Sequence, residues 1–535
     1  MTAGLGVAGL ALLGAAPALA ADVDPSIRGS ITVHKFEMPE SPTGLPNNGT
    51  EVDTTGLEPL EGVTFQARKV NEVDLSTNVG WTAANELVAG LVATSNEAAA
   101  ASITAQSATL GAPVSGVTNG DGEYTFDDLG IGLYLVTETA APAGTTPVKP
   151  FLVTVPLTDP GSRTGWLYDV HVYPKNSVAG ATKTVDDSTI AKPGDKTAWT
   201  ITADIPNDAV ISAFKIVDPL DPRLTLDAAS VAATLSNGTS LEAGTDYTVA
   251  SPTKQTTRAA SAAEIAEGYV YEAGEDYTEL TVELTAAGLA KLAANNSASV
   301  VVTFSTTVKQ GAVVNGPIPN QATIYPNQDA YVYAPGNPGE PPTPPEGTEV
   351  PPPAETNVPV GKWGNITFHK VDTSDANLPG AEFTVEFRVL GAGGVPGAWT
   401  PFTLGDGTST WTSDATGLLT VPQLRYSGWA DGAAVASGAE GYVEYRLIEV
   451  KAPAGFELLP DPIPFTIDDA TSTLDPDGAY QVDMTVENVP SNAGFTLPLT
   501  GGAGSMVIYA AGVFVLAGAV LLLVRTRRKA EATES

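Results

Sequence analysis

Short runs in which apolar and polar residues alternate make up most of the sequence. Val, Thr, Ile, Phe and Tyr are frequent in these runs, Gly and Pro separate them, and long segments with a helical period are scarce. Successive side chains of a strand point to opposite faces, so alternation with a period of two is typical of half-buried strands. Many short strands separated by turn residues predict an all-β protein built from β-sandwich domains.

Two parts of the chain repeat each other in sequence. GSITVHK matches GNITFHK, LEGVTF matches LPGAEF, and YLVTE with APAG matches YRLIE with APAG. Each copy closes with a strand that ends in an asparagine, at Asn176 and at Asn488. These repeats predict that the first and third domains share a fold, whereas the middle region is strand-rich with a different pattern. We expect domains at 22–178, 179–334 and 360–490, and an extended proline-rich linker or interdomain brace at 335–359.

Both ends of the chain carry export signals. Residues 1–21 are mostly apolar and end in small residues, which is typical of a signal peptide and its cleavage site. At the other end, the apolar run Met506–Val524 is long enough to span a bilayer and is followed by a basic tail. We therefore expect a transmembrane segment and a basic tail within residues 491–535. The pentapeptide Leu497, Pro498, Leu499, Thr500 and Gly501 precedes them, and this order resembles a cell-wall sorting signal.

Charge and composition exclude several classes of function. The formal net charge is −35, with 61 acidic and 26 basic residues, so we expect no nucleic-acid partner. The absence of cysteine excludes disulfides and a thiol nucleophile. The three histidines, His34, His171 and His369, fall on outward strand positions far apart in the sequence, without the spacing of a metal site or a catalytic triad. We expect no cofactor, no metal site and no enzymatic activity.

Three polar side chains are expected to meet in the core of the third domain. The apolar stripes of three of its strands end in Lys370, Glu449 and Asn488, each on the inward face. Buried polar groups are costly unless they satisfy one another. Burial lowers the pKa of a lysine and raises that of a carboxyl, so a neutral amine could attack the Asn amide while a protonated Glu polarises it. This attack expels ammonia and leaves a Lys–Asn isopeptide bond.

The other two domains carry comparable sets of residues. In each domain, a Lys lies on the first strand and an Asn lies on the last strand. An acidic residue lies on a strand between these two, at the end of a row of apolar side chains. Asp221 is a competing choice for the middle-domain acid, and whether the first-domain bond forms is left open. The simpler alternative for each set is a buried ion pair or a lysine whose charged end reaches solvent. The sets are Lys35, Glu138 and Asn176 in the first domain, and Lys183, Asp218 and Asn320 in the middle domain.

Several motifs resemble those of Gram-positive pilins that sortase enzymes assemble. The segments around Glu138 and Glu449 resemble the E-box of Cna-B-type pilin domains, although Val450 replaces the usual Thr. Phe214–Leu220 resembles the matching stretch of Cna-A-type domains, in which an Asp replaces the Glu. Trp166–Asn176 resembles the pilin motif, and the C-terminal segment resembles the LPXTG cell-wall sorting signal. The resemblance implies three tandem immunoglobulin-like β-sandwich domains of Cna-B, Cna-A and Cna-B type.

The resemblance also implies how subunits are joined. Strand parity turns Lys175 outward if Asn176 points into the core. In the family, a pilin-specific sortase cleaves after the Thr of the sorting signal and forms a thioester, which the pilin-motif Lys of the next subunit attacks. Carried onto this chain, the resemblance implies a bond between Lys175 and Thr500. It further implies that three acids promote the internal autocatalytic bonds, namely Glu449, Asp218 and Glu138.

These inferences describe the major shaft subunit of a secreted, wall-anchored surface fimbria, most like an actinobacterial type 2 fimbria. The expected partners are identical subunits, a pilin-specific and a housekeeping sortase, peptidoglycan, a tip pilin, and a host or bacterial glycan receptor that supports adhesion. The alternatives are an accessory or tip adhesin that binds carbohydrate or matrix ligands, and a wall-anchored hydrolase. The chain has little room for an inserted binding domain and shows neither a nucleophile motif nor paired carboxylates, which favours the shaft subunit.

Overall fold

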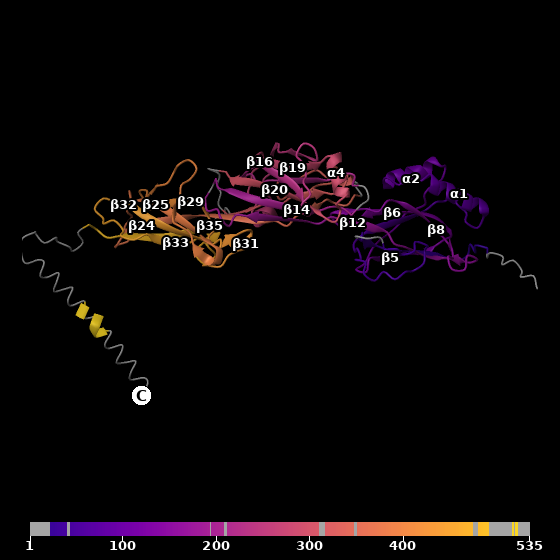
Figure 1. Ribbon diagram of the computed structural model, residues 1–535, viewed down its shortest axis with the longest axis horizontal. Coiled ribbons are helices and arrows are strands. Elements are labelled where there is room, and N and C mark those ends of the chain that lie inside the picture. Colours follow the sequence, from indigo (N-terminus) through magenta and orange to yellow (C-terminus); the bar gives the residue numbers. More distant parts are fainter. Residues whose placement is uncertain are drawn as a thin grey trace, which may run out of the picture.

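A computed structural model describes nine ranges of the chain: residues 22–39, 43–192, 194–207, 211–309, 316–346, 350–474, 480–491, 516–517 and 519–522. Three groups of sheets follow one another along the long axis of the molecule (Figure 1). The predicted signal peptide, the sorting pentapeptide and most of the apolar run after it lie outside the described residues. Within the described ranges, none of the helices is both long enough and apolar enough to cross a membrane.

The first group is a two-sheet sandwich in which β1 and β11 are parallel neighbours. One sheet has the order β11-β1-β5, and the other has the order β4-β3-β6-β8. Alternating residues of β1 and β6 fill the core, because Ile31, Val33 and Val136 are fully buried. The strands are β1 (Gly29–His34), β2 (Phe36–Glu37), β3 (Thr64–Lys69), β4 (Val114–Val117), β5 (Glu123–Leu129), β6 (Gly132–Ala140), β7 (Thr145–Thr146), β8 (Phe151–Val155), β9 (Leu157–Thr158), β10 (Trp166–Leu167), β11 (Asp169–Val172) and β12 (Lys175–Val178).

Two helices between β3 and β4 were not predicted from the sequence. They are α1 (Asn78–Ala89) and α2 (Asn96–Ala105), and their N-caps are Thr77 and Ser95, whose side chains accept backbone hydrogen bonds. The helices bury few and mostly small residues, so their apolar periodicity is weak. The two capping residues are the signals that could have located them.

The middle group is a second two-sheet sandwich. Its sheets have the orders β13-β14-β20-β16 and β17-β19-β15-β22-β23, with β18 beside β19. Trp199, Phe214 and Phe304 belong to the buried core between them. The elements are β13 (Ala181–Asp186), β14 (Lys196–Asp204), β15 (Lys215–Pro219), β16 (Leu224–Leu235), β17 (Tyr247–Ala250), β18 (Thr253–Gln255), α3 (Ala262–Glu267), β19 (Asp276–Leu284), α4 (Ala286–Ala293), β20 (Ser299–Val308), β22 (Thr323–Tyr325), η1 (Asp329–Val332) and β23 (Ala354–Glu355).

The third group repeats the plan of the first. β24 pairs in parallel with β35, with Ile366 opposite Val482, as β1 pairs in parallel with β11. The core contains Phe368, Phe383 and Leu447. The elements are β21 (Gly316–Pro319), β24 (Val360–Asp372), β25 (Glu382–Gly391), η2 (Ala392–Gly394), β26 (Val395–Pro396), β27 (Thr400–Pro401), β28 (Trp411–Thr412), β29 (Leu418–Arg425), β30 (Trp429–Ala430), β31 (Ala433–Ala434), β32 (Val443–Lys451), β33 (Ile463–Phe465), β34 (Thr473–Leu474) and β35 (Tyr480–Asn488).

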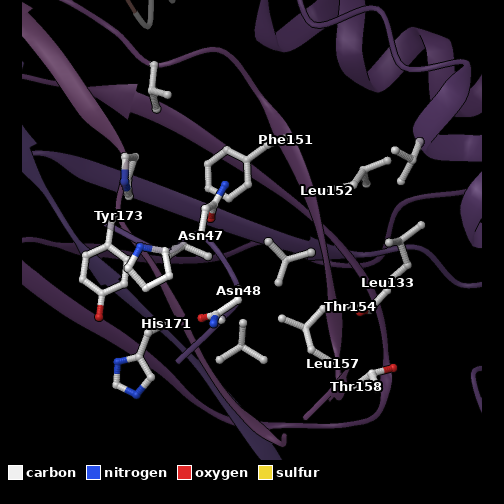
Figure 2. A pocket seen from close by; sticks show the side chains of 18 of the residues that line it. Asn47, Asn48, Leu133, Phe151, Leu152, Thr154, Leu157, Thr158, His171 and Tyr173 are labelled. Atoms are coloured by element: carbon white, nitrogen blue, oxygen red, sulfur yellow. The ribbon is translucent and has the colours of Figure 1, made fainter. Parts of the chain in front are cut away.

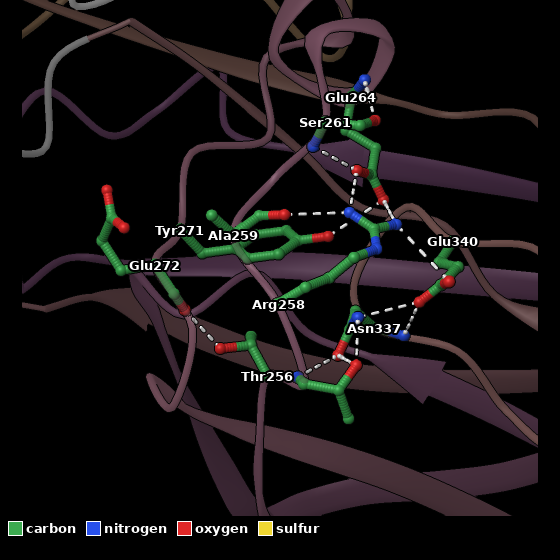
Figure 3. Close-up of polar contacts among 10 residues, drawn as sticks. Thr256, Arg258, Ala259, Ser261, Glu264, Tyr271, Glu272, Asn337 and Glu340 are labelled. Atoms are coloured by element: carbon green, nitrogen blue, oxygen red, sulfur yellow. Dashed lines mark hydrogen bonds and ion pairs between the residues drawn. The ribbon is translucent and has the colours of Figure 1, made fainter.

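The proline-rich segment packs against the middle and the first sandwiches. Figure 3 shows Arg258 between Glu264 and Glu340, with nitrogen–oxygen distances of 2.7 Å and 3.4 Å. Asn337 accepts a hydrogen bond from the Thr257 backbone at 3.0 Å. Farther along, the carbonyl of Pro352 accepts a hydrogen bond from Gly144 of the first sandwich at 2.9 Å. These contacts tie the segment to the middle and first sandwiches.

A buried polar contact joins the middle and third sandwiches. The side chain of Arg425 is 1% exposed and donates hydrogen bonds to the carbonyls of Asp187 and Gly441. The carboxylate of Asp431 accepts from the backbone N–H groups of Asp187 and Ser188, both at 2.9 Å, and the Asp187 carboxylate accepts from the Asp431 N–H. These reciprocal bonds fix how the two sandwiches meet.

Candidate functional site

The first candidate site is a buried cluster in the first sandwich. Lys35 directly follows β1, Glu138 lies on β6 and Asn176 lies on β12, and all three side chains are buried. The Lys35 amine donates to Glu138 Oε2 at 2.9 Å and also to the Asn176 amide oxygen. Asn176 Nδ2 donates to Glu138 Oε1 at 2.5 Å. The carboxyl therefore contacts both amine and amide, which is the position of a group that moves protons between them.

The third sandwich contains a comparable cluster. Lys370, Glu449 and Asn488 lie on β24, β32 and β35 and are buried. Asn488 Nδ2 donates to the two Glu449 oxygens at 2.9 Å and 3.0 Å. The Lys370 amine donates to the carbonyl of Val486 at 2.9 Å, on the strand that carries Asn488. Among the described residues, the Asn488 amide oxygen has no hydrogen-bond partner.

In the middle sandwich all three residues of the predicted set are buried, and the lysine contacts the acid. Lys183 lies on β13, Asp218 lies on β15, and Asn320 lies between β21 and β22, each at most 1% exposed. The Lys183 amine is 2.5 Å from Asp218 Oδ2. Within the described part of the chain, neither amide atom of Asn320 has a hydrogen-bond partner, nor does Asp218 Oδ1. Buried polar atoms without partners are rare and costly, so this cluster needs a chemical explanation.

Asp221 has a different partner. Its two carboxylate oxygens accept from Arg223 Nε at 2.8 Å and Arg223 Nη2 at 2.7 Å. The structure therefore places Asp218, not Asp221, against Lys183.

Burial changes the acid–base properties of the three lysines. Desolvation lowers the pKa of Lys35, Lys183 and Lys370 to about 8 in each case, although the neighbouring carboxylate opposes the shift. About one amine in ten is then neutral at pH 7, against roughly one in three thousand for an ordinary lysine. Burial also raises the pKa of Asp218, which favours its protonated form. The clusters thus contain amines with unusual nucleophilic character.

The second candidate site is a cleft of about 830 Å³ in the first sandwich, and Lys175 lines it. Phe151 and Leu157 form apolar parts of the wall, and Asn47 and Asn48 supply amide groups (Figure 2). Lys175 is half-buried, and its amine donates to the carbonyl of Tyr173 at 3.2 Å. Burial lowers the Lys175 pKa. The side chain points away from the core, as strand parity predicts, but it lies in a recess and not on an open surface.

Two histidines lie near this cleft in an arrangement that the sequence did not reveal. His34 and His171 occupy adjacent parallel strands, and their Nε2 and Nδ1 atoms are 2.8 Å apart. His34 is buried, its Nδ1 is 2.9 Å from the Glu123 carboxylate, and its ring stacks on Tyr173. The sequence placed these histidines on outward positions far apart along the chain, whereas the structure buries His34 and brings it into contact with His171. In the described ranges, no three His, Asp or Glu side chains are placed to hold a metal ion.

Comparisons with known proteins agree with this architecture. Residues 28–177 match the family model of the N-terminal domain D1 of Gram-positive pilin subunits. Residues 364–478 match a prealbumin-like fold domain, and residues 489–531 match the LPXTG cell-wall anchor motif.

Full-length relatives extend the match to nearly the whole chain. Fimbrial subunit type 1 of Actinomyces viscosus is 30% identical over 95% of this chain and 92% of its own length. Fimbrial subunit type 2 of Actinomyces naeslundii is 30% identical over 98% of this chain and 96% of its own. The full-length major pilin SpaD of Corynebacterium diphtheriae is similar in structure, with a TM-score of 0.60 and 28% identity over 88% of this chain and 98% of SpaD.

The chain belongs to the family of Gram-positive, sortase-assembled major pilins. It is a structural subunit of a covalent fimbria that is anchored to the cell wall, and not an enzyme. The predicted all-β, immunoglobulin-like fold class is confirmed.

Proposed function

We propose that the amine of Lys175 is joined to the carbonyl carbon of Thr500 from a neighbouring subunit. The observation that carries this proposal is the recessed position of Lys175 in a cleft with both apolar and amide-bearing walls. Apolar walls suit the Leu and Pro side chains of a sorting pentapeptide, and amide side chains suit its backbone. In this account a pilin-specific sortase supplies Thr500 as a thioester, and a housekeeping sortase attaches the finished polymer to peptidoglycan. A tip pilin and a glycan receptor complete the proposed partners.

Deletion of Leu497–Gly501 tests this function. Wild-type cells should give a ladder of covalent multimers on denaturing gels, and the deletion should abolish both the ladder and attachment to the wall, because no acyl donor remains. A matched deletion of five residues after the basic tail, Glu531–Ser535, should leave the ladder intact. Persistence of multimers in the Leu497–Gly501 deletion would show that another segment supplies the carbonyl.

We propose in addition that the buried clusters become internal Lys–Asn bonds. The pairs are Lys35 with Asn176, Lys183 with Asn320, and Lys370 with Asn488, with Glu138, Asp218 and Glu449 as the respective proton-transferring acids. The supporting observations are the lowered lysine pKa values and the amide groups of Asn320 and Asn488 that lack full hydrogen bonding. Bond formation would remove these uncompensated groups, since the amide nitrogen leaves as ammonia and the lysine loses its charge.

The intact mass of the recombinant ectodomain, residues 22–496, provides a direct count of these bonds. We expect the measured mass to fall below the sequence mass by one ammonia per bond, with at least the middle-domain and third-domain bonds formed. Lys370→Arg should reduce this deficit by one ammonia, whereas Lys451→Arg, an exposed lysine of the same domain, should leave the deficit unchanged. A mass equal to that of the sequence would contradict the proposal.

We also infer the domain boundaries from the strand pairings. The first domain would end with β12 at Val178. Because β23 pairs with β22, the middle domain would extend through the proline-rich segment to Glu355, beyond the expected end at 334. β21 pairs with β24, so this strand would pass from the middle domain to the edge of the third domain.

A further inference from the structure

Lys175 needs a proton acceptor to act as a nucleophile. Although burial lowers its pKa, a lysine that is only half-buried is mainly an ammonium ion at neutral pH. An ammonium has no lone pair, so it cannot attack a carbonyl until a base removes one proton. The residues that line the cleft with Lys175 include one with a suitable group, His171. Figure 2 shows His171 beside Tyr173 at the cleft wall.

The contacts of the two histidines determine where their protons lie. An ionised carboxylate only accepts hydrogen bonds, so Glu123 at 2.9 Å requires a hydrogen on His34 Nδ1. A neutral His34 then has its lone pair on Nε2, which must accept a hydrogen from His171 Nδ1 at 2.8 Å. A neutral His171 with hydrogen on Nδ1 has its lone pair on Nε2. Among the described residues, His171 Nε2 has no hydrogen-bond partner, so it is available as a base.

The surroundings hold this arrangement in place. The His34 ring lies between two others, with centroids 5.1 Å from His171 and 4.7 Å from Tyr173. The Tyr173 hydroxyl accepts from the Val52 backbone at 2.9 Å, which anchors the stack. Burial lowers the pKa of His34, so the buried ring is neutral near pH 7, while Glu123 opposes this shift. The titratable groups around His34 are Glu123 on β5, Glu51 in the loop before β3, and His171 on β11.

Lys175 lines the same cleft as His171. It lies four residues after His171, and its amine donates to the carbonyl of Tyr173, which stands between them in sequence.

We propose that Glu123, His34 and His171 form a proton relay that deprotonates Lys175 for the joining reaction. This inference rests on the proposed role of Lys175. His171 Nε2 takes a proton from the ammonium, and the neutral amine attacks the thioester carbonyl carbon. The new C–N bond forms as the C–S bond breaks, the departing sulfur takes the second proton from nitrogen, and the imidazolium releases its proton to water. Glu123 and His34 act as positioning residues, because they fix the tautomer of His171.

The test uses the full mature chain in detergent with a purified pilin sortase and a synthetic peptide that contains Leu-Pro-Leu-Thr-Gly. The rate of peptide attachment is measured by mass spectrometry between about pH 6 and about pH 9.5, a range that includes the titration of histidine and approaches that of lysine. Wild type should show a pH dependence of the rate that requires His171. His171→Gln should lower the rate about 100-fold at pH 7, and the rate should then rise steadily to the highest pH as the free amine forms.

Two further variants and two controls separate the possible outcomes. Glu123→Gln and His34→Gln should change this pH dependence and lower the rate about tenfold, less than loss of the base itself. His369→Gln, in the third sandwich, should behave as wild type. An unchanged pH profile in His171→Gln, or a loss equal at every pH, would overturn the relay while leaving the role of Lys175 intact. Attachment that persists in Lys175→Arg would instead contradict the proposed function itself.

Discussion

Cells that produce Lys175→Arg should display the subunit at the wall only as a monomer. The guanidinium keeps the positive charge of the side chain but remains protonated at any cellular pH, so it supplies no amine nucleophile. Folding and secretion should be unaffected, because the Lys175 amine donates to the nearby Tyr173 carbonyl and the side chain lies outside the core. Attachment to the wall needs only the sorting signal. Denaturing gels of wall extracts should therefore lose the multimer ladder completely and retain the monomer band.

Lys149→Arg is the matched control for this experiment. Lys149 lines the same cleft as Lys175 but is exposed, and it lies outside the segment that resembles the pilin motif. Its substitution should leave the ladder unchanged. A normal ladder in Lys175→Arg would mean that another lysine accepts the acyl group, and Lys149 would then be the first to examine.

Glu449→Ala should prevent the internal bond of the third domain without destroying its fold. The apolar side chains on both sheets supply the packing, whereas the Glu449 carboxylate accepts hydrogen bonds from Asn488 and from the Leu459 backbone. By analogy with a disulfide, a bond that closes a loop of this length contributes about 4–5 kcal/mol through the entropy of the unfolded chain. Its loss should lower the thermal midpoint of the domain by on the order of 15 °C. Calorimetry and protease digestion measure this change.

Two variants separate the chemical role of Glu449 from a packing role. Glu449→Gln keeps the size of the side chain but cannot exchange a proton, so it should also lack the bond. Glu487→Ala removes an exposed carboxylate next to Asn488 and should retain both the bond and the wild-type midpoint. Detection of a Lys370–Asn488 crosslink in Glu449→Ala would refute the role assigned to this carboxyl.

Strand alternation predicted the buried clusters well because it is a local property. Once Ile366 and Phe368 are assigned to the core, Lys370 must face the same way, and the structure buries it completely. The same argument places Lys183 and Asn320 in the core of the middle sandwich. Sequence reasoning left Asp218 and Asp221 as alternatives. The contact that separates them, between Asp221 and Arg223, depends on loop geometry after β15 and not on alternation.

Contacts between distant strands were less predictable. The meeting of His34 and His171 requires that β1 pair in parallel with β11, and no local pattern specifies this register. The contact of Arg425 with Asp187 depends on how two sandwiches meet, which the sequence of neither domain reveals. Helices α1 and α2 were missed for a different reason, since their buried residues are mostly small and leave little apolar periodicity. The two long-range contacts therefore depend on information that does not lie in a short stretch of sequence, whereas the helices carried a local signal in their capping residues.

Mass spectrometry of protease-digested wild-type fibres locates the bond between subunits. We expect a branched peptide in which the side-chain amine of Lys175 is bonded to the carboxyl end of a second peptide that terminates at Thr500. The mass of this species should be the sum of the two peptides less one water, and fragmentation should place the branch at Lys175. Fibres in which Lys175 is recovered unmodified, with Thr500 attached to a different lysine, would contradict the account.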